Sequence, residues 1–231
     1  MKIYEGKAKI IETTEDENLL VQIFKDSLTA FNAEKKDNRE GKGGLNNRIS
    51  TILFEYLQDN IIPTHFMKQI DEKAMLIKRV KIFKVEVVIR NITAGSIVKR
   101  LGLKRGEEIN PPILEFYYKD DALGDPLINN EHILYLGIAN EKEIERISHL
   151  SRRVNNLLRV KFDKCGLLLV DLKLEFGTDK EGEILLADEI SPDTCRLWDK
   201  DTKESLDKDL FREDKGDVLF GYKEVLRRLS L

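Results

Sequence analysis

The chain has 231 residues, of which 41% are hydrophobic and 35% are charged, with 14 glycines and 5 prolines. This composition is typical of a soluble folded protein of one large or two small domains, and it excludes a disordered or collagen-like chain. The net charge of −3 leaves no basic excess to hold a polyanion, so we expect no nucleic-acid partner.

The predicted elements begin with strands. Apolar residues alternate between Leu20 and Phe24, and Gly6 interrupts a strand-like segment near the start, which favours a hairpin. Apolar residues spaced by three and four from Leu45 to Leu57 predict an amphipathic helix. The later elements are strands at 75–80 and 85–92, a short helix at 94–101, a long helix at 141–164, strands at 167–176 and 183–190, and a helix from residue 218. We therefore expect an α+β fold of two lobes, in which antiparallel sheets are flanked by helices.

The second predicted hairpin carries charged residues on a strand that is otherwise apolar. Side chains alternate across a strand, so Asp171, Lys173 and Glu175 share one face. The simplest register of the hairpin sets Asp188 directly opposite Asp171. Two facing carboxylates repel each other unless a cation lies between them, which suggests a hard divalent metal such as magnesium.

An exposed hairpin with a charged outer face is the alternative interpretation. In the same register, Ile184 and Leu186 share the face of the charged residues, which is unusual for a solvated surface and favours the floor of a cleft. Lys173 could then hold a carboxylate or a phosphate, and the three acidic side chains would divide metal and hydroxyl contacts between them.

A short glycine-containing segment near the N-terminus supplies positive charge. Gly6, Lys7, Ala8 and Lys9 form a flexible turn with two ammonium groups, which could clamp a polyphosphate. The P-loop pattern, in which Gly-Lys is followed by Ser or Thr, is absent from the sequence, and so is the dinucleotide pattern Gly-x-Gly-x-x-Gly. These absences exclude the usual P-loop and Rossmann nucleotide sites.

Two further segments could bind an anion. Arg90 ends an apolar strand and Ser96 begins the next helix, where backbone N–H groups and a hydroxyl could meet a phosphate; a simple helix cap is the alternative. The turn after Asp188 presents Asp193 and Arg196 beside the proposed metal. Arg90, Ser96, Asp193 and Arg196 are therefore candidate substrate-binding residues.

The cysteines and the N-terminus bear on the compartment. Cys165 and Cys195 form no Cys-x-x-Cys pair, so neither a disulfide scaffold nor a zinc site is expected. The first residues lack the apolar run of a signal peptide, and apolar segments elsewhere are too short to cross a bilayer. We expect a cytoplasmic protein with no membrane partner.

Several motifs, in order along the chain, resemble those of one family, the ATP-dependent SAICAR synthetases (phosphoribosylaminoimidazole-succinocarboxamide synthases) of purine biosynthesis. The resemblance covers nearly the whole chain. It rests on Tyr4–Lys9, Glu40–Gly43, Leu45–Asn47, Val88–Asn91, Ala94–Ser96, Asn110–Pro112, Val170–Gly177, Asp188–Glu189, Ser191–Asp193 and Arg196–Lys200. Ile89 stands where valine is common, and Thr194–Cys195 where small residues often precede the arginine.

This resemblance implies a fold distantly similar to that of protein kinases. It also implies an enzyme that joins 5-amino-1-(5-phospho-D-ribosyl)imidazole-4-carboxylate to L-aspartate while ATP becomes ADP and phosphate. A carboxylate is a poor acylating agent, because oxide is a poor leaving group, so an acyl phosphate made from ATP would be the species that the amine attacks. The implied partners are these small molecules, the cofactor is magnesium, and the chain is expected to form a homo-oligomer.

The resemblance also implies a role for each candidate residue. Residues 1–80 would form a nucleotide-clamping lobe, and residues 81–231 a lobe that binds substrate and metal. Gly6, Lys7, Ala8 and Lys9 would cover the ATP phosphates; Lys78, Val80 and Ile82 would belong to the adenine hinge; Glu175 and Asp188 would bind magnesium in the ATP site; Arg90, Ser96 and Arg196 would hold the ribonucleotide; and Lys173 and Asp171 would orient the reacting carboxylate.

Two other functions use the same residue types. A small-molecule kinase needs a glycine turn, a lysine and paired acids to transfer a phosphoryl group to a hydroxyl. A nucleotide-sensing module without catalysis is less favoured, because the candidate acids and bases are all in place. Dependence on aspartate separates the ligase from the kinase, and ATP binding without phosphate release would indicate the sensing module.

Overall fold

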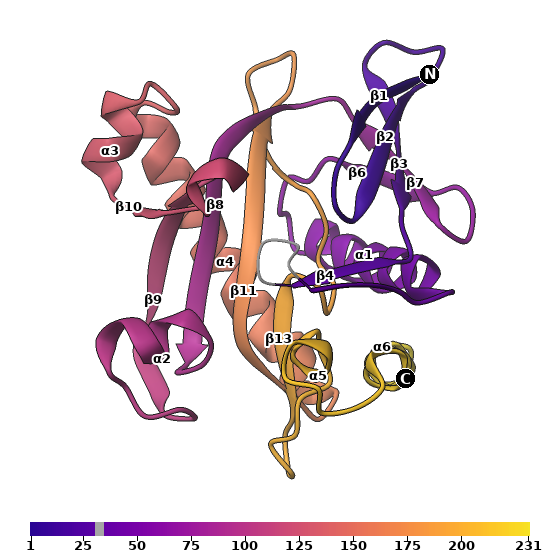
Figure 1. The fold of residues 1–231 in the computed structure, drawn as a ribbon. Coiled ribbons are helices and arrows are strands. Elements are labelled where there is room, and N and C mark those ends of the chain that lie inside the picture. Colours follow the sequence, from indigo (N-terminus) through magenta and orange to yellow (C-terminus); the bar gives the residue numbers. More distant parts are fainter. Residues whose placement is uncertain (31–34) are drawn as a thin grey trace.

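A five-stranded antiparallel sheet is formed by the N-terminal part of the chain (Figure 1). The computed structural model describes residues 1–30 and 35–231. In this sheet β1 pairs with β2 on either side of Gly6, so the predicted N-terminal hairpin is confirmed. The strand order is β1 (Lys2–Glu5), β2 (Lys9–Thr13), β3 (Leu19–Phe24), β7 (Ala74–Lys78) and β6 (Phe66–Gln69); β4 (Ser27–Ala30) and β5 (Lys35–Asn38) pair separately.

A second antiparallel sheet begins at residue 81, and β11 pairs with three of its other strands. β8 pairs with one edge of β11, while β12 and β13 pair with two stretches of the other edge. The strands are β10 (Leu127–Ile128), β9 (Glu108–Tyr118), β8 (Lys81–Ile92), β11 (Leu167–Thr178), β12 (Ile184–Ala187) and β13 (Cys195–Asp199). The expected α+β fold with antiparallel sheets is confirmed.

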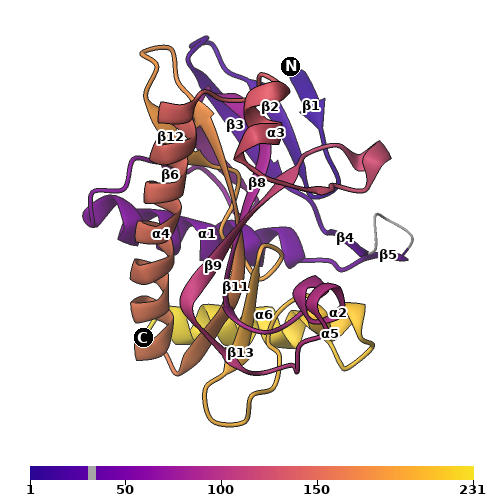
Figure 2. The ribbon, with the colours of Figure 1, turned by 90° about the vertical axis from the view of Figure 1, so that its left-hand side faces the viewer.

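Helices pack against both sheets (Figures 1 and 2). α1 (Lys42–Asp59) contacts the first sheet and α6 (Val218–Leu229), and α4 (Glu141–Lys164) runs along β11, β8 and β12. The predicted bounds of α4 are confirmed, because Asn140 and Glu143 form a reciprocal capping box and Gly166 follows in a left-handed conformation with φ +69°. The shorter helices are α2 (Ser96–Leu101), α3 (Asn130–Tyr135), α5 (Asp209–Arg212) and the 3-10 turn η1 (Asp121–Leu123).

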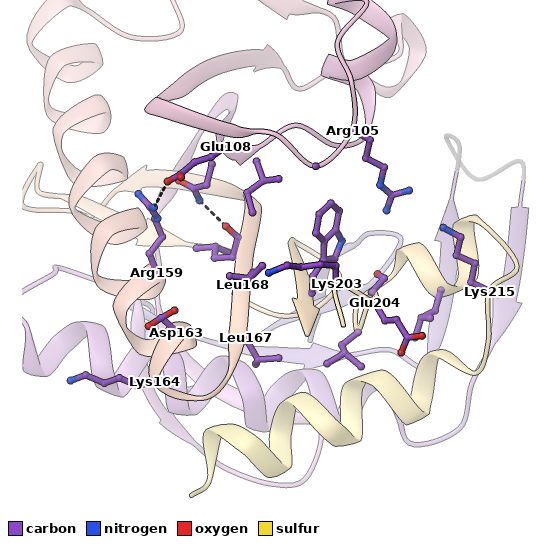
Figure 3. A pocket seen from close by; sticks show the side chains of 18 of the residues that line it. Arg105, Glu108, Arg159, Asp163, Lys164, Leu167, Leu168, Lys203, Glu204 and Lys215 are labelled. Atoms are coloured by element: carbon purple, nitrogen blue, oxygen red, sulfur yellow. Dashed lines mark hydrogen bonds and ion pairs between the residues drawn. The ribbon is translucent and has the colours of Figure 1, made fainter. Parts of the chain in front are cut away.

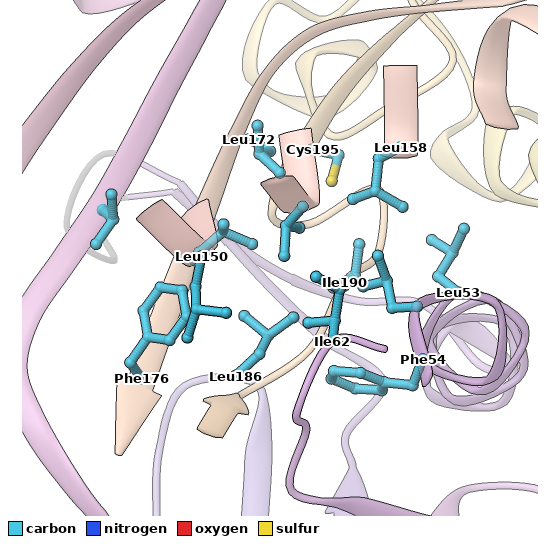
Figure 4. Packing of buried hydrophobic residues seen from close by; sticks show 14 of the residues in the cluster. Leu53, Phe54, Ile62, Leu150, Leu158, Leu172, Phe176, Leu186, Ile190 and Cys195 are labelled. Carbon is cyan, nitrogen blue, oxygen red and sulfur yellow. The ribbon is translucent and has the colours of Figure 1, made fainter. Parts of the chain in front are cut away.

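One hydrophobic core is shared by the two sheets. Figure 4 shows side chains of α1, α4, β11 and β12 meeting in it. Because this core fixes the sheets relative to each other, charged side chains from both can converge on one place. The roles given to residues 1–80 and 81–231 stay predictions. The core includes Leu53, Phe54, Ile62, Leu150, Leu158, Leu172, Phe176, Leu186 and Ile190.

The predicted register of the β11–β12 hairpin is wrong. Phe176 pairs with Leu186, so Asp188 lies beyond the end of β12 and is not opposite Asp171. The shift is an odd number of residues, so it moves the side chains of β12 to the other face. Ile184 and Leu186 therefore lie on the core side of the sheet, and not on the face of the charged residues.

The turn of this hairpin explains the error. Asp179 N donates to Glu183 O at 3.0 Å, and the Asp179 side chain accepts from Glu183 N at 2.8 Å. Gly182 has φ +82°, a conformation that favours glycine. The loop is therefore Lys180–Gly182, and not the longer loop from Gly177 that the sequence suggested.

The strand β9 was absent from the predicted elements. It contains Pro111 and Pro112, and proline cannot donate to a sheet ladder, so the sequence pattern argued against a strand. β9 pairs with β8 along most of its length and carries Glu115 and Tyr117 beside Arg90.

Candidate functional site

The face of β11 that holds the predicted charged residues lies where the two sheets meet. Asp171 and Glu175 are buried, with 4% and 3% of their surface exposed, and Lys173 lies between them. The alternate residues, Leu172 and Leu174, belong to the hydrophobic core. Because a strand rises about 3.3 Å per residue, the Cα atoms of neighbouring members of this set lie roughly 7 Å apart along the strand. A polar face of this kind needs charged partners to be stable.

Lys173 lies between the two carboxylates that were predicted to hold a metal. Its Nζ is 2.6 Å from Glu175 Oε1 and 3.6 Å from Asp188 Oδ2, and it is 2.9 Å from Glu86 Oε1 on β8. Lys119, just after β9, pairs with the other oxygen of Glu175. Glu175 and Asp188 are therefore close enough to share one cation.

Lys9 enters the same cluster from the first sheet. It is the first residue of β2, and its ammonium pairs with Asp188 and lies 3.0 Å from Glu189 Oε1. The pairing links the N-terminal hairpin to the segment after β12. Lys9, Lys119 and Lys173 thus surround Glu175 and Asp188, and we name these five residues the lysine–carboxylate cluster.

The other members of the predicted polyphosphate clamp form the loop before Lys9. Gly6 N donates to Lys9 O at 2.8 Å, and Ala8 O accepts from Lys25 N at 2.8 Å. The Lys7 ammonium lies 2.7 Å from Asp121, in an exposed ion pair. Lys7 therefore points to a different partner from Lys9, and the phosphate contacts of Gly6, Lys7 and Ala8 stay predictions.

The cluster is charged at neutral pH. Burial by itself would raise the pKa of Asp188, but the charges of Lys9, Lys173 and Lys119 outweigh it and hold that pKa well below its usual value. Burial would lower the pKa of Lys173, but the nearby carboxylates of Glu175 and Asp188 raise it above the usual value for lysine. Asp188 and Lys173 therefore act as fixed charges, and not as groups that exchange protons near pH 7.

The backbone at Asp188 is strained. Its φ is +65°, in the left-handed region that few residues other than glycine, asparagine and aspartate adopt. The Asp188 carbonyl accepts a hydrogen bond of 3.1 Å from Gln22 Nε2 on β3. Strain held by surrounding contacts is common at functional sites, and here it directs the Asp188 carboxylate into the cluster.

The pair Glu175 and Asp188 fits a magnesium ion. Their oxygens already lie on either side of one ammonium group, and carboxylate oxygens are the ligands that Mg²⁺ prefers. Over residues 1–30 and 35–231, no group of three or more His, Cys, Asp or Glu side chains is arranged to hold a metal. A metal here would therefore take two carboxylates from the protein and its other ligands from phosphates and water, as Mg²⁺ does at nucleotide sites.

Arg90 and Arg196 meet at the other end of the charged face, on Asp171. Arg90 Nη1 and Arg196 Nη1 both donate to Asp171 Oδ2, at 3.0 and 2.8 Å. Arg90 Nη2 also donates to Ser96 Oγ at 3.1 Å. The structure thus brings together three predicted ribonucleotide-binding residues, and Asp171 lies between the two arginines.

The backbone beside Arg196 needs a glycine. Gly95 has φ +62°, and a Cβ at this position would lie 2.7 Å from the Arg196 guanidinium. The close approach lets the loop before α2 lie directly against the arginine. A side chain at position 95 would therefore displace the Arg196 guanidinium.

The carboxyl group of Asp207 is buried close to Arg196. Burial raises the pKa of Asp207 to about 7, and the nearby charge of Asp209 adds to the effect. Between pH 4 and 7 the folded chain then holds a proton that the unfolded chain has lost, so this group makes folding less favourable as pH rises. We expect the free energy of unfolding of the parent to fall, relative to that of Asp207→Asn, across this range.

Urea unfolding at pH 4, 5, 6 and 7 measures this difference. The variant loses some hydrogen bonding, because Asp207 accepts from Leu197 N at 2.8 Å and from Asp209 N at 2.7 Å, but that cost does not depend on pH. The slope of the difference with pH is therefore the test. Parallel curves for parent and variant would mean that Asp207 titrates in its normal range.

Asp193 lies in a buried network of its own. Its carboxylate accepts from Tyr222 OH at 2.7 Å and from Asn46 Nδ2 at 2.8 Å, and it pairs with the Lys42 ammonium at 2.5 Å. Lys42 is 1% exposed, so this ion pair ties the start of α1 to the turn before β13 and to α6. These contacts favour a structural role, and the substrate-binding role of Asp193 stays a prediction.

The predicted adenine hinge is the connection between the two sheets. Lys78 ends β7, Val80 follows, and Ile82 lies in β8. A Cβ at Gly177 would lie 2.8 Å from Val80 Cγ2, so the glycine lets β11 approach this connection closely. Adenine binding by these residues stays a prediction.

Sequence reasoning missed Glu86, Lys119 and Glu115. Glu86 could have been found, because it alternates with buried Val85 and Val87 as Lys173 does with its neighbours on β11. Lys119 and Glu115 lay in or next to the strand that the prolines concealed.

A separate cavity of about 1410 Å³ lies between β11, β13, α4 and α6 (Figure 3). Its lining includes Leu168, Lys203, Arg159 and Arg105, and it shares no residue with the lysine–carboxylate cluster or with the arginines on Asp171. Figure 3 shows charged side chains around its rim and apolar ones within it. We therefore place the candidate site on the charged face of β11 and not in this cavity.

Comparisons with known proteins agree on one family. The sequence model of the SAICAR synthetase family matches residues 2–229. Phosphoribosylaminoimidazole-succinocarboxamide synthase of Wolinella succinogenes is 57% identical, over 98% of this chain and 97% of that protein, and the Bacillus subtilis enzyme of the same name is 55% identical, over 99% and 95%. A solved SAICAR synthetase structure (Type-2), in complex with ADP, matches with a TM-score of 0.96 and 48% identity, over 98% of this chain and 97% of that one. Within the described ranges, no helix is long and apolar enough to span a membrane.

Proposed function

Because this chain belongs to the SAICAR synthetase family, we propose that it is the ATP-dependent ligase that joins 5-amino-1-(5-phospho-D-ribosyl)imidazole-4-carboxylate to L-aspartate, giving SAICAR, ADP and phosphate. The observation that carries this proposal is the charged face of β11. Asp171 holds two arginines at one end, Glu175 lies in the lysine–carboxylate cluster at the other, and Lys173 lies between them. A phosphate-bearing substrate and a polyphosphate would therefore meet at Lys173.

This arrangement suits phosphoryl transfer between two bound anions. Arg90, Ser96 and Arg196 would hold the ribonucleotide phosphate, since arginine forks match phosphate oxygens and a hydroxyl can donate to one. Lys9 would contact the ATP phosphates from the N-terminal hairpin. Bound Mg²⁺, held by Glu175 and Asp188, would neutralise charge on the transferring phosphoryl group.

The acyl phosphate route accounts for every atom. An oxygen of the imidazole carboxylate attacks the γ-phosphorus of ATP; this P–O bond forms while the bond to the ADP oxygen breaks. The aspartate amine then attacks the acyl carbon: the C–N bond forms, the acyl C–O bond breaks, and phosphate leaves with the former carboxylate oxygen while the nitrogen loses a proton to solvent. Lys173 would stabilise negative charge on the reacting carboxylate, and Asp171 would keep the two arginines beside it.

An assay of the purified protein tests this function. Protein, ATP and Mg²⁺ are incubated with the ribonucleotide and L-aspartate, and ADP release is measured with each substrate omitted in turn. We expect full release with all four components and formation of one succinocarboxamide per ADP. A stable phosphorylated ribonucleotide formed without aspartate would indicate a kinase, and nucleotide binding without ADP release would indicate a sensing module. We also expect a homo-oligomer, which light scattering would measure.

Replacing Arg90 tests the ribonucleotide site. We expect Arg90→Lys to raise the KM for the ribonucleotide more than the KM for ATP, because lysine keeps the charge but loses the planar fork that reaches Asp171 and Ser96 together. A charged hydrogen bond contributes about 1.5–3 kcal/mol, so the rise should be on the order of tenfold or more. Steady-state kinetics with each substrate varied in turn provides the measurement. Equal changes in both constants would remove Arg90 from the ribonucleotide site.

A further inference from the structure

An alternating chain of charges crosses the second sheet. It runs from Arg100 on α2 through β9, β8, β11 and β13 to Arg212 on α5, with each carboxylate paired to an arginine on both sides. Its members are Arg100, Glu115, Arg90, Asp171, Arg196, Asp209 and Arg212. The four arginines exceed the three carboxylates by one positive charge, which suits the binding of an anion. Arg90 and Arg196 lie in the middle, so their positions depend on the outer members.

Glu115 is the outer member with the most contacts to Arg90 and its surroundings. Its side chain is 8% exposed, and its Oε2 accepts from Arg90 Nε at 3.0 Å and from Tyr117 OH at 2.9 Å. The other oxygen, Oε1, pairs with Arg100. Both carboxylate oxygens are therefore engaged, and the side chain cannot rotate without breaking charged hydrogen bonds.

Arg90 is held on three sides. Its Nε donates to Glu115, its Nη1 to Asp171, and its Nη2 to Ser96 Oγ and Tyr117 OH, both at 3.1 Å. A guanidinium has five N–H donors, so these contacts leave one on Nη1, next to the oxygen that Arg196 also shares. The plane of the guanidinium is therefore set by Glu115 and Tyr117 on one edge and by Asp171 on the other.

We propose that Glu115 is a positioning residue of the ribonucleotide site, which fixes the plane of the Arg90 guanidinium so that its free donor and those of Arg196 converge on the substrate phosphate. This proposal rests on the proposed function, since it takes Arg90 and Arg196 as ligands of that phosphate. An arginine fixed in advance loses less side-chain freedom on binding, so the effect falls on substrate affinity. Glu115 itself does not contact the reacting atoms in this arrangement.

The test is Glu115→Gln, which keeps the size of the side chain and one acceptor oxygen but removes its charge. We expect the KM for the ribonucleotide to rise about tenfold, the low end of the effect of one charged hydrogen bond, with the KM for ATP unchanged. Inhibition by inorganic phosphate, used as a probe of the same site, should weaken in parallel. Glu108→Gln is the matched control, because Glu108 lies on the same strand with its side chain 71% exposed and 3.6 Å from Arg159. It should change neither constant.

A double-mutant cycle decides whether Glu115 acts through Arg90. In the Arg90→Lys background, Glu115→Gln should raise the ribonucleotide KM much less than it does in the parent, since the guanidinium that it orients is gone. An equal rise in both backgrounds would overturn the proposal. If Arg90→Lys alone leaves the ribonucleotide KM unchanged, the placement of the substrate fails and this inference fails with it. If Arg90→Lys raises that constant and Glu115→Gln does not, the proposed function stands and the inference alone is wrong.

A second variant keeps the test valid if Glu115→Gln does not fold. Tyr117→Phe removes one hydroxyl that contacts both Arg90 and Glu115, with almost no change in volume. We expect a smaller rise in the ribonucleotide KM, no change in the KM for ATP, and an unfolding midpoint close to that of the parent. A loss of stability with equal changes in both constants would show that the Glu115–Tyr117 contacts serve folding only.

Discussion

Asp188→Asn should lower turnover on the order of 10²-fold or more. The side chain is a proposed magnesium ligand and the partner of Lys9, so the substitution removes one charge from the place where a phosphoryl group would transfer. Asparagine has the same shape and also tolerates the left-handed backbone, with φ +65° at this position. The change is therefore one of charge, and kcat measured at saturating ATP and ribonucleotide reports it.

The stability of this variant carries a second expectation. Removing the carboxylate leaves Lys9 and Lys173 with one partner fewer, so the variant should melt below the parent when no ligand is present. Addition of Mg²⁺ and ADP should raise its melting temperature less than that of the parent.

Asp214→Asn is the control, because it makes the same chemical change at an exposed position outside the candidate site. Asp214 also has a positive φ, of +52°, and forms an ion pair with Lys35, but 83% of its side chain is exposed. We expect it to keep the turnover and the ligand-dependent shift of the parent. Full activity in Asp188→Asn as well would mean that Asp188 is only part of a charged surface.

The fold and much of the site could be predicted from local patterns. The helix α4 was predicted at both ends, because its apolar periodicity and the glycine that follows it, Gly166, are both local signals. The shared face of Asp171, Lys173 and Glu175 follows from strand alternation alone, which does not depend on the neighbouring strand. These features are properties of one segment of chain.

Features that depend on two segments were harder to predict. The register of β11 with β12 depends on which residues form the turn, and several loops were compatible with the glycines around Asp179. The facing pair of Asp171 and Asp188 was therefore wrong, although both residues are in the site region. Asp171 in fact meets Arg90 and Arg196, contacts that only the pairing of β8 and β13 with β11 brings about.

Ion pairs between residues far apart in the sequence could not be predicted for the same reason. The buried pairing of Lys42 with Asp193 joins residues far apart in the sequence. Lys119 follows a strand with two prolines and pairs with Glu175 across the sheet. Neither contact leaves a periodic signal in the sequence, because each needs only one residue on either side.

Lys173→Met should reduce turnover by at least the same order as Asp188→Asn, about 10²-fold. The increase in melting temperature on addition of Mg²⁺, which should be smaller than the parent's in Asp188→Asn, should be larger than the parent's in Lys173→Met. The ammonium lies among Glu175, Asp188 and Glu86, so its loss leaves three carboxylates with less positive charge between them. We expect the metal-free variant to melt below the parent, because like charges then repel across a buried site. Lys180→Met, in the nearby hairpin loop with 63% of its side chain exposed, is the control and should match the parent.

The melting temperature with Mg²⁺ alone then separates a metal site from a merely charged one. In Lys173→Met a divalent cation can take the place of the missing ammonium between Glu175 and Asp188, so Mg²⁺ should raise the melting temperature more than it does in the parent. In Asp188→Asn one of the two ligands is lost, so the same addition should raise it less. A shift of equal size in parent and both variants would place the metal elsewhere. A larger increase in Lys173→Met than in the parent and a smaller one in Asp188→Asn, with turnover reduced in both variants, would require that Lys173 and the metal share these two carboxylates.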